Sequence, residues 1–405
     1  MIRAGQLASL RAETPGLRDA AHGHVHLNHA GASLLPQAAL DAIYAHLQLE
    51  QQVGPMDAAA DVAEQLQQLR ANLARLINAQ PDEIALMRSG SDAFGSAFAA
   101  MPRLKHGDRI LVGRQEWGGN LVNYQRAAQA AGASVDVIPC HADGSVDAGA
   151  LANQIDAQVR LISLTWLPAN GGLINDAVSV GKVAAAAGVP YLIDAGQALG
   201  QIPVDVQALQ CDILKSAGRK HLRGPRGTGV LYVKRSFLST LNPAWVDVAS
   251  APFSADGSAL RDDARRFESS ETAVALQLGL AESVRLALEI GVEQIALTTA
   301  SLARTLRTRL AAIPGVRLHD LGSDEQRSGL VSFNLHGHDA AALKNELGRQ
   351  GIHIGANGVA YTPLDMQARG LHSVARASLS YLNTVDDIEM LAQALERMSC
   401  LHAST

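Results

Sequence analysis

The sequence predicts an α/β protein whose larger part is a mainly parallel, seven-stranded sheet, followed by a smaller α/β unit. Seven short β-rich apolar runs, most of them separated by stretches of helix length, lead to this interpretation. The runs cover residues 84–86, 109–112, 135–138, 161–164, 191–193, 212–214 and 230–233. Ligands of such sheets bind at the carboxyl ends of the strands, so the residues that follow these runs are the first candidates for a site.

The pattern changes after residue 267. Two long segments, 272–288 and 294–312, indicate helices that connect two parts of the chain. A shorter strand and helix pattern then covers residues 316–318, 329–335, 340–349, 352–354, 375–382 and 386–398. We therefore expect a large domain over residues 40–285 and a small domain made of residues 1–39 and 286–405.

Composition is that of an ordinary globular protein. Of the 405 residues, 47% are hydrophobic and 18% are charged, so disorder is not expected. A net charge of -5 with mixed signs argues against nucleic acid or an anionic membrane as partner. The apolar runs are too short to span a bilayer, and the N-terminus lacks the pattern of a secretory signal. Three scattered cysteines without CxxC spacing predict a reducing, cytoplasmic location.

The most specific chemistry lies around Asp194 and Lys220. Asp194 follows an apolar run, and Lys220 lies in a Gly- and Arg-rich segment that begins at Ser216, a further candidate cofactor contact. An acid at a strand end, a lysine beyond it and a glycine-dense turn suit pyridoxal phosphate, because the lysine forms a Schiff base and the acid keeps the ring nitrogen protonated. Lys215 is a competing lysine, but Lys220 is favoured by its neighbour Arg219, a partner for phosphate, and by a rigid Gly-Pro turn.

A candidate anion site follows the first run. Gly90, Ser91 and Asp92 lead into a helix, whose first N–H groups and dipole attract negative charge. Gly90 permits close approach, while Ser91 and Asp92 can cap the helix. A helix cap without any ligand explains the same residues equally well.

Three further residues suit the flat ring of a cofactor. Trp117 precedes two glycines in a chain with only 4% aromatic residues, and its indole could stack on a ring or simply cover the sheet end. Asn170 could hydrogen-bond a ring substituent, although the turn chemistry of Asn-Gly-Gly explains it as well. Gln197, three residues after Asp194, is a better candidate for the phenolic oxygen of the ring.

Arg376 stands inside an apolar alternation near the end of the chain. A buried arginine is costly unless it is paired. Its guanidinium can bind a substrate carboxylate through two parallel hydrogen bonds, and an internal salt bridge is the alternative.

Together, these segments resemble the class V aminotransferase family, which includes cysteine desulfurases, selenocysteine lyases, isopenicillin N epimerase and the C–S lyase of ergothioneine synthesis. The motifs that carry the resemblance follow one another over nearly the whole chain: LNHAGASLLP, RSGSDAF, QEW, IDAGQ, GRKHLRGPRGTGVLYV, RRFESSE and VARASLSYLNT. The resemblance implies the type I aminotransferase fold, pyridoxal phosphate as cofactor, an amino acid as substrate and, as is usual in the family, a homodimer.

The resemblance also implies a role for each candidate. Lys220 would carry the cofactor, Asp194 would face the ring nitrogen, Gln197 would bond the phenolic oxygen, and Trp117 would stack on the ring where many relatives have His. The residues implied around the phosphate are Gly90, Ser91, Asp92 and Arg219. Those implied near the substrate are Arg376, for its α-carboxylate, and His29. Glu271 stands where many relatives have Thr, so the usual contact of the RRFESSE segment with the neighbouring subunit's phosphate is not implied.

One departure from the family bears on the reaction. Cysteine desulfurases carry a sulfur-accepting Cys in the loop before the last strands, and residues 351–361 contain none. We therefore expect β-elimination of a cysteine-derived amino acid, a C–S lyase reaction, with epimerisation or transamination as alternatives. The Arg219–Lys220 pair and residues 362–370 look closer to the lyase and epimerase branch than to the desulfurases.

A different class of function is a metal-dependent hydrolase built on His22, His24, His26 and His29. Alternating histidines on a strand point to one face, and HxH is a spacing of metal ligands. The later histidines do not sit consistently at strand ends, so no metal site is expected. A scaffold that keeps the cofactor without catalysis is disfavoured by the intact set of Lys220, Asp194 and Arg376.

Overall fold

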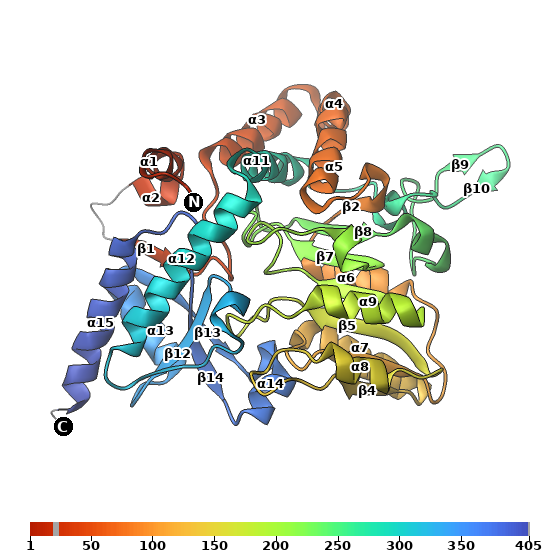
Figure 1. Cartoon of the computed structure of the whole chain (residues 1–405). Helices are drawn as coiled ribbons and strands as arrows, with labels where there is room; N and C mark the ends of the chain where they lie inside the picture. The colour runs from red at the N-terminus through yellow and green to blue at the C-terminus, as the bar shows by residue number, and fades with distance from the viewer. Residues whose placement is uncertain (19–23, 404–405) are drawn as a thin grey trace.

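Two lobes make up the molecule, each built around its own sheet. The structure is a computed structural model that describes residues 1–18 and 24–403. In Figure 1, the green and yellow elements surround a seven-stranded sheet, and the blue and cyan elements surround a five-stranded sheet. The α/β class predicted from the sequence is confirmed.

The large sheet has the strand order β2–β8–β7–β6–β5–β3–β4. Its strands are β2 (Ile84–Met87), β3 (Arg109–Val112), β4 (Ser134–Val137), β5 (Val159–Thr165), β6 (Tyr191–Asp194), β7 (Ile213–Ala217) and β8 (Gly229–Val233). Each of the seven predicted runs overlaps one of them. Strand β8 runs antiparallel to both of its neighbours, and the other neighbouring pairs are parallel.

Helices cover both faces of this sheet. One apolar core joins it to α5 (Ala63–Ile77), α8 (Ala148–Gln154), α9 (Ala177–Ala187), α10 (Val206–Leu209) and α11 (Val274–Ile290). The core on the opposite face joins it to α6 (Gly90–Ala99) and α7 (Gly118–Ala131). Because the central strands are buried on both faces, their sequences are continuously apolar rather than alternating.

The small sheet combines both ends of the chain. Its order is β1–β13–β14–β12–β11, and β1 pairs in parallel with β13. The strands are β1 (Val25–Leu27), β11 (Val316–Leu318), β12 (Leu330–Leu335), β13 (Ile352–Gly358) and β14 (Ser373–Ser378). Its core includes α12 (Val292–Ala311), α13 (Ala340–Arg349) and α15 (Val385–Ala403). The two sheets have separate apolar cores, and the domain division at residues 40 and 285 remains a proposal.

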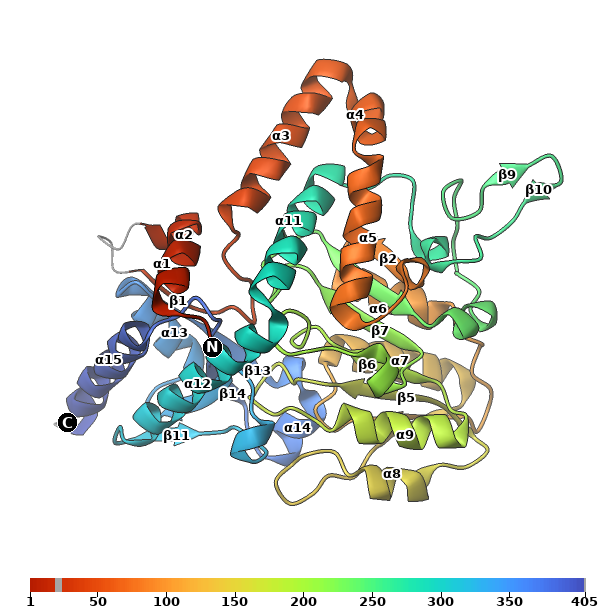
Figure 2. The same cartoon turned by 45° about the horizontal axis from the view of Figure 1, so that its top comes forward.

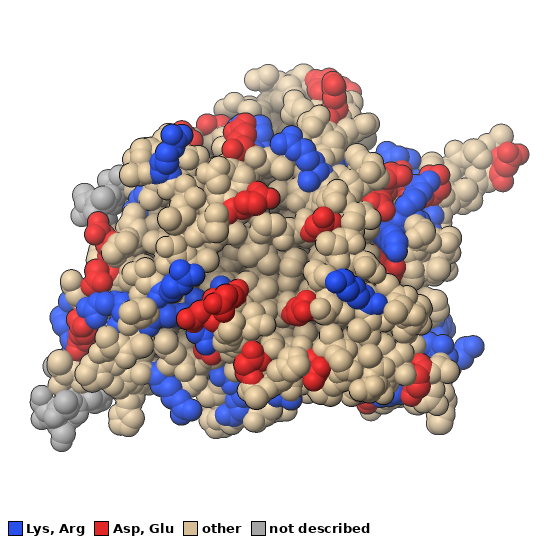
Figure 3. Space-filling model, viewed as in Figure 1, with Lys and Arg blue, Asp and Glu red and all other residues tan. Residues whose placement is uncertain are grey.

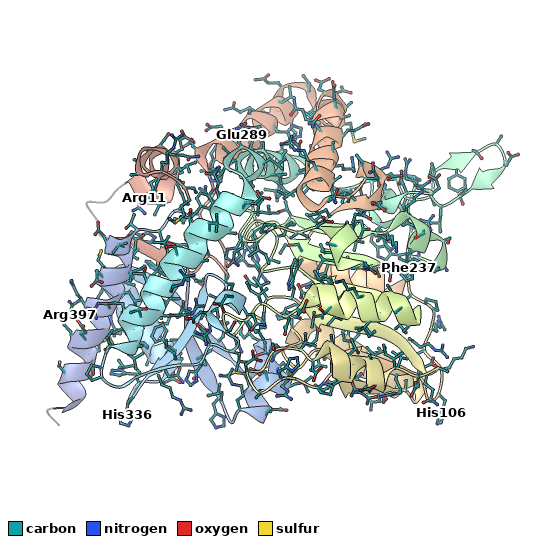
Figure 4. All side chains as sticks on the ribbon, in the orientation of Figure 1. Arg11, His106, Phe237, Glu289, His336 and Arg397 are labelled. Carbon is teal, nitrogen blue, oxygen red and sulfur yellow. The ribbon has the colours of Figure 1, made fainter. Side chains whose placement is uncertain are left out.

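The remaining elements lie at the periphery. Helices α3 (Gln37–Val53) and α4 (Pro55–Asp61) project beyond the large sheet together with α5, as Figure 2 shows. Helices α1 (Ala4–Ala12) and α2 (Pro15–Arg18) rest near α15, where Arg11 donates to the carbonyl oxygen of Leu382 at 2.6 Å (Figure 4). The shorter elements are α14 (Pro363–Ala368), β9 (Phe253–Ser254), β10 (Gly257–Ser258), η2 (Pro81–Glu83), η3 (Arg235–Thr240), η4 (Ala264–Phe267), η5 (Asp324–Gln326) and η6 (Val359–Tyr361).

One predicted strand is too long. The pattern predicts a strand over residues 375–382, but β14 ends at Ser378. The side-chain oxygen of Asn383 accepts the N–H of Ser380 at 2.9 Å, and the N–H of Asn383 returns to the carbonyl oxygen of Ser380. This side-chain-to-backbone bond closes a turn in place of a ladder.

Charge and hydropathy in the structure agree with the composition. Acidic and basic side chains are interspersed over the face drawn in Figure 3. Within residues 1–18 and 24–403, no single helix combines the length and apolar content needed to cross a membrane, and α11 and α12 meet both criteria only as a pair bent by 81°.

The contact between β8 and the start of α6 depends on a glycine, and replacing it should destabilise the fold. A Cβ on Gly229 would lie 2.4 Å from the carbonyl carbon of Ser89, the residue that caps α6. We expect Gly229→Ala to lower the free energy of unfolding by about 1–3 kcal/mol, as overpacking does. Gly95→Ala is the matched control, because its Cβ meets nothing within 4 Å and alanine favours a helix. Thermal unfolding that is unchanged in Gly229→Ala would contradict this prediction.

Candidate active site

Two adjoining cavities lie where the carboxyl end of the large sheet faces the small sheet. Their volumes are about 460 Å³ and 200 Å³. They share the side chains of Trp117, Arg219, Lys220 and Arg226. Sequence-predicted residues at the smaller cavity are Gly90, Ser91, Trp117, Asp194, Arg219 and Lys220, and those at the larger one are Trp117, Gln197, Arg219, Lys220 and Arg376.

Asp194 is the last residue of β6, and each of its carboxylate oxygens already has a donor. Its Oδ2 lies 2.5 Å from Nζ of Lys215 and accepts from the amide of Asn120 at 3.1 Å, while Oδ1 accepts from the N–H of Gly196 at 2.9 Å. Burial acts to raise the pKa of Asp194, but the ammonium groups of Lys215 and Lys220 outweigh it and hold the pKa below its usual range. Asp194 is therefore a buried carboxylate ready to face a cation.

Lys220 is half-buried in the turn that follows β7. Burial lowers the pKa of its ammonium to about 7, against the attraction of Asp194 and with the help of the nearby cations Lys215, Arg219 and Arg376. At neutral pH, a substantial fraction of this amine is consequently unprotonated. An unprotonated amine is the form that attacks a carbonyl carbon or accepts a proton.

Trp117 owes its position to the glycine pair that follows it. A Cβ on Gly119 would lie 2.2 Å from the indole ring, and one on Gly118 would lie 2.0 Å from the carbonyl oxygen of Ala360. The two glycines therefore allow the indole to lie across the start of α7 while the η6 segment approaches. The backbone N–H of Trp117 donates to the hydroxyl of Thr165 at 3.0 Å, which fixes the turn.

The start of α6 and the loop after β7 form a cationic cradle at the smaller cavity. Gly90 and Ser91 line it from the first turn of the helix, opposite Arg219, Arg226 and Thr228. Helix N–H groups and guanidinium groups are the donors that bind phosphate. The cradle thus suits a dianion.

Arg376 lies in β14 and is almost completely buried. Its guanidinium donates to the carbonyl oxygen of Ala169 at 2.7 Å and to the side-chain oxygen of Asn28 at 3.2 Å, while Nε has no hydrogen-bond partner among residues 1–18 and 24–403. No carboxylate within the described residues forms an ion pair with it, so the predicted alternative of an internal salt bridge is not seen. Burial lowers the pKa of Arg376 to about 10, and the group stays charged at neutral pH.

The residues present fit pyridoxal phosphate. The side-chain oxygen of Gln197 is buried without a partner among the described residues, although its amide nitrogen donates to the carbonyl oxygen of Ala30 at 3.1 Å. A flat ring has the indole of Trp117 to stack on, and Asp194 is available to its nitrogen. Buried polar atoms without partners are costly, and a polar ligand removes that cost.

Four predicted residues do not line either cavity. Asn170 directs its amide to the carbonyl oxygen of Gly358 and the hydroxyl of Thr362, because the turn brings Ala169 to the cavity instead. Ser216 is buried on β7 and donates to the carbonyl oxygen of Ala195. These two side chains act within the scaffold.

The other two of the four are Asp92 and His29. The cap of α6 is Ser89, whose hydroxyl accepts the backbone N–H of Asp92, so the prediction that Ser91 and Asp92 cap the helix is wrong; the carboxylate of Asp92 pairs with Arg88 at 2.9 Å. His29 is held between the hydroxyls of Ser33 and Ser380, and its neighbour on β1, His26, reaches the larger cavity in its place.

Sequence reasoning missed two buried polar residues at the smaller cavity, Lys215, which lines it, and Glu116. Lys215 entered only as a rival of Lys220, and the structure pairs it with Asp194. Glu116 is fully buried, and burial raises its pKa to about 7. A lysine inside the apolar run of β7 was the available signal, because a buried charge requires a partner.

The histidines near the N-terminus do not form a metal site among the described residues. His24 and His26 lie at β1, where the His24 ring is 4.4 Å from that of His353. His22 lies outside the described residues. Within the described part of the chain, no group of three or more His, Cys, Asp or Glu side chains is placed to hold a metal ion.

Comparison with known proteins identifies one protein family over most of the chain. The family model described as aminotransferase class-V matches residues 25–391. A cysteine desulfurase of Dickeya dadantii is 30% identical over 402 residues, which are 96% of each chain. A probable cysteine desulfurase of Xylella fastidiosa is 30% identical over 396 residues, 95% of this chain and 94% of its own.

Two solved structures share the fold. The cysteine desulfurase CsdA of Escherichia coli superposes with a TM-score of 0.88 at 27% identity, covering 98% of both chains. The cystine C–S lyase C-DES, in complex with its reaction product cysteine persulfide, superposes with a TM-score of 0.84 at 25% identity, covering 95% of this chain and 99% of its own. The fold is therefore the type I aminotransferase fold, and the chain belongs to the class V aminotransferase family of pyridoxal phosphate enzymes.

Proposed function

We propose that the protein is a pyridoxal phosphate-dependent C–S lyase, which releases a thiol from a cysteine-derived amino acid by β-elimination. No persulfide on its own chain takes part in this reaction. The observation that supports the proposal is the convergence of Lys220, Asp194 and Arg376 on adjoining cavities that no cysteine lines.

The three cysteines of the chain all lie elsewhere. Cys211 belongs to the apolar core beneath the large sheet, Cys140 is half-buried after β4, and Cys400 lies on α15. In place of a loop that carries a sulfur acceptor, residues 352–361 form β13 and η6, which line the larger cavity. The reaction product of the similar cystine C–S lyase C-DES is cysteine persulfide, a small molecule.

The proposed roles follow from the geometry. Bound pyridoxal phosphate supplies the electron sink that makes the Cα–H bond of an amino acid acidic. Arg376 would hold the α-carboxylate, and Lys220 would carry the cofactor and then accept the Cα proton on Nζ. Asp194 would hold its negative charge opposite the ring nitrogen, and Trp117 would supply a flat face. The groups proposed for the phosphate are Gly90, Ser91, Arg219 and Arg226.

A cysteine-free variant tests the proposal directly. Purified wild-type protein and the triple variant Cys140→Ser, Cys211→Ala, Cys400→Ser would be assayed with L-cystine and S-substituted cysteines for pyruvate, ammonia and thiol. We expect equal amounts of pyruvate from both proteins. Sulfide transfer that disappears in the triple variant would instead identify a desulfurase. Inverted substrate without pyruvate would identify an epimerase, and a keto acid that requires an acceptor would identify a transaminase.

The protonation of Lys220 predicts how fast the apoprotein takes up its cofactor at each pH. Because the pKa of Lys220 is lowered to about 7, the rate of covalent attachment should fall about tenfold for each pH unit below 7 and level off above it. Visible absorbance after mixing measures this rate. The rate at which an N-blocked lysine amide reacts with the cofactor is the control, because it reports how ionisation of the cofactor itself changes the rate with pH. A protein rate that keeps rising to pH 10, as the control rate does, would contradict the prediction.

We also propose a homodimer. Helices α3 and α4 expose large apolar side chains, among them Tyr44 at 59%, Leu47 at 48% and Met56 at 84% exposure. An apolar patch on a projecting pair of helices marks an interaction surface. Sedimentation of wild-type protein beside a Tyr44→Glu, Leu47→Glu variant tests the assembly, because a monomeric wild-type protein would exclude it.

A further inference from the structure

Lys215 is a buried lysine at the point where the cofactor ring is expected. It lies in the middle of β7, all of whose residues but Ala217 are buried, and it is 5% exposed. Its Nζ lies 2.5 Å from Oδ2 of Asp194 and 4.9 Å from the centre of the Trp117 ring. The Lys215 ammonium therefore lies next to both groups proposed to hold the ring, Asp194 and Trp117.

The neighbourhood of Lys215 contains few other charges. Asp194 is the only carboxylate within ion-pair distance of Nζ in the described chain. Glu116 is the next acid: its carboxylate accepts from the amide of Asn120, which also donates to Asp194. Burial raises the pKa of Glu116 to about 7, so it is a weaker source of negative charge. Lys220 is a second amine whose positive charge acts on Asp194.

Asp194 therefore has three donors before any ligand arrives: Lys215, Asn120 and the N–H of Gly196. A ring nitrogen that approaches Asp194 must share the carboxylate with an ammonium group that cannot move into water. The negative charge of Asp194 is then shared between the Lys215 ammonium and the protonated ring nitrogen. Asp194 therefore stabilises the protonated ring nitrogen less.

We propose that Lys215 is a positioning residue that competes with the cofactor's ring nitrogen for Asp194 and thereby lowers the fraction of that nitrogen that is protonated. A ring with an unprotonated nitrogen is a weaker electron acceptor. In transamination, the ring must hold the negative charge left by removal of the Cα proton until a proton returns to the cofactor. Elimination needs charge only until the thiolate leaves the Cβ atom. Lys215 consequently favours elimination over transamination. This inference depends on cofactor binding, and it holds whichever amino acid is the substrate.

The test reads the ring nitrogen directly. Wild-type protein, Lys215→Met and Lys215→Arg would be loaded with pyridoxal phosphate carrying 15N in the ring, and the 15N resonance would be recorded at one pH. We expect Lys215→Met to shift the resonance to that of a protonated ring, while Lys215→Arg keeps the wild-type position. Lys234→Met is the matched control, because it removes a different lysine with a carboxylate partner, 3.9 Å from Asp212, outside the site.

Each outcome decides the inference. An identical resonance in wild type and Lys215→Met overturns it, and so does a shift of equal size in Lys234→Met. If the apolar variant fails to fold, Lys215→Gln serves the same comparison, because glutamine donates a hydrogen bond without carrying charge. The ratio of keto acid formed by transamination to pyruvate formed by elimination gives a second readout, which should rise several-fold in Lys215→Met. The C–S lyase proposal fails separately, if pyruvate is absent while the resonance shifts as expected.

Discussion

Replacing Lys220 with alanine should lower turnover by about 10³-fold or more, because the variant loses both a nucleophile and a proton acceptor at the reacting carbon. Among the described residues, Lys220 is the only lysine that lines both cavities, and the neighbouring lysine, Lys215, is paired with Asp194. The variant should still bind pyridoxal phosphate without a covalent bond, through the cradle, Trp117 and Asp194. Borohydride treatment followed by mass spectrometry checks the link, and the pyruvate assay checks turnover.

The control for this experiment is a lysine of the same charge away from the cavity. Lys182 lies exposed on α9, so Lys182→Ala should keep both the covalent link and the turnover. A Lys220→Ala protein that retains wild-type turnover would disprove the assignment of Lys220. A reduced cofactor found on Lys215 in wild-type protein would do the same.

Replacing Asp194 with alanine should have the largest effect on stability. The change leaves the Lys215 ammonium buried without its carboxylate, and breaking a buried ion pair in this way costs about 3–5 kcal/mol. It also removes the acceptor of two hydrogen bonds, from Asn120 and Gly196. Denaturant unfolding of the apoprotein measures the loss, and cofactor titration of the same variant should show weakened binding.

A double variant separates the ion pair from the packing. If the loss comes from the unpaired ammonium, Asp194→Ala combined with Lys215→Met should recover part of the stability, giving an interaction energy between the two sites. Additive losses would show that the pair is energetically unimportant. Asp212→Ala is the matched control, since its partner Lys234 reaches solvent, and exposed pairs contribute about 1 kcal/mol or less.

The fold could be predicted from sequence because its signals are local. Buried strands need apolar runs, and the seven runs became the seven strands of the large sheet. Asp194 ends a strand, and Gly90 and Trp117 lie within a few residues after strand ends, so the geometry of the sheet brings all three to one edge. Lys220 and Arg376 reach the same place from loops and from a second sheet, and they were predicted through motif chemistry and family resemblance.

Other parts of the site depend on contacts that sequence patterns do not encode. The pairing of Lys215 with Asp194 comes from the register of β6 against β7, which places the two residues opposite each other. Ala169 lines the larger cavity in place of the predicted Asn170, because the direction of a side chain in a turn depends on what packs against it. For the same reason, the histidine that lines the larger cavity is His26 and not the predicted His29, which lies three residues further along the chain.

The pairing of β1 with β13 sets the order in which a newly made chain can complete its site. Gly90, Asp194 and Lys220 have all left the ribosome well before β13 and β14 are synthesised, so the cofactor cradle can close early. β1, by contrast, pairs with a strand that is synthesised some 325 residues later, since Val25 pairs with Ile352. Contacts of such long sequence separation form late in folding. The pocket proposed for the amino acid is therefore assembled last, next to the lobe proposed to hold pyridoxal phosphate.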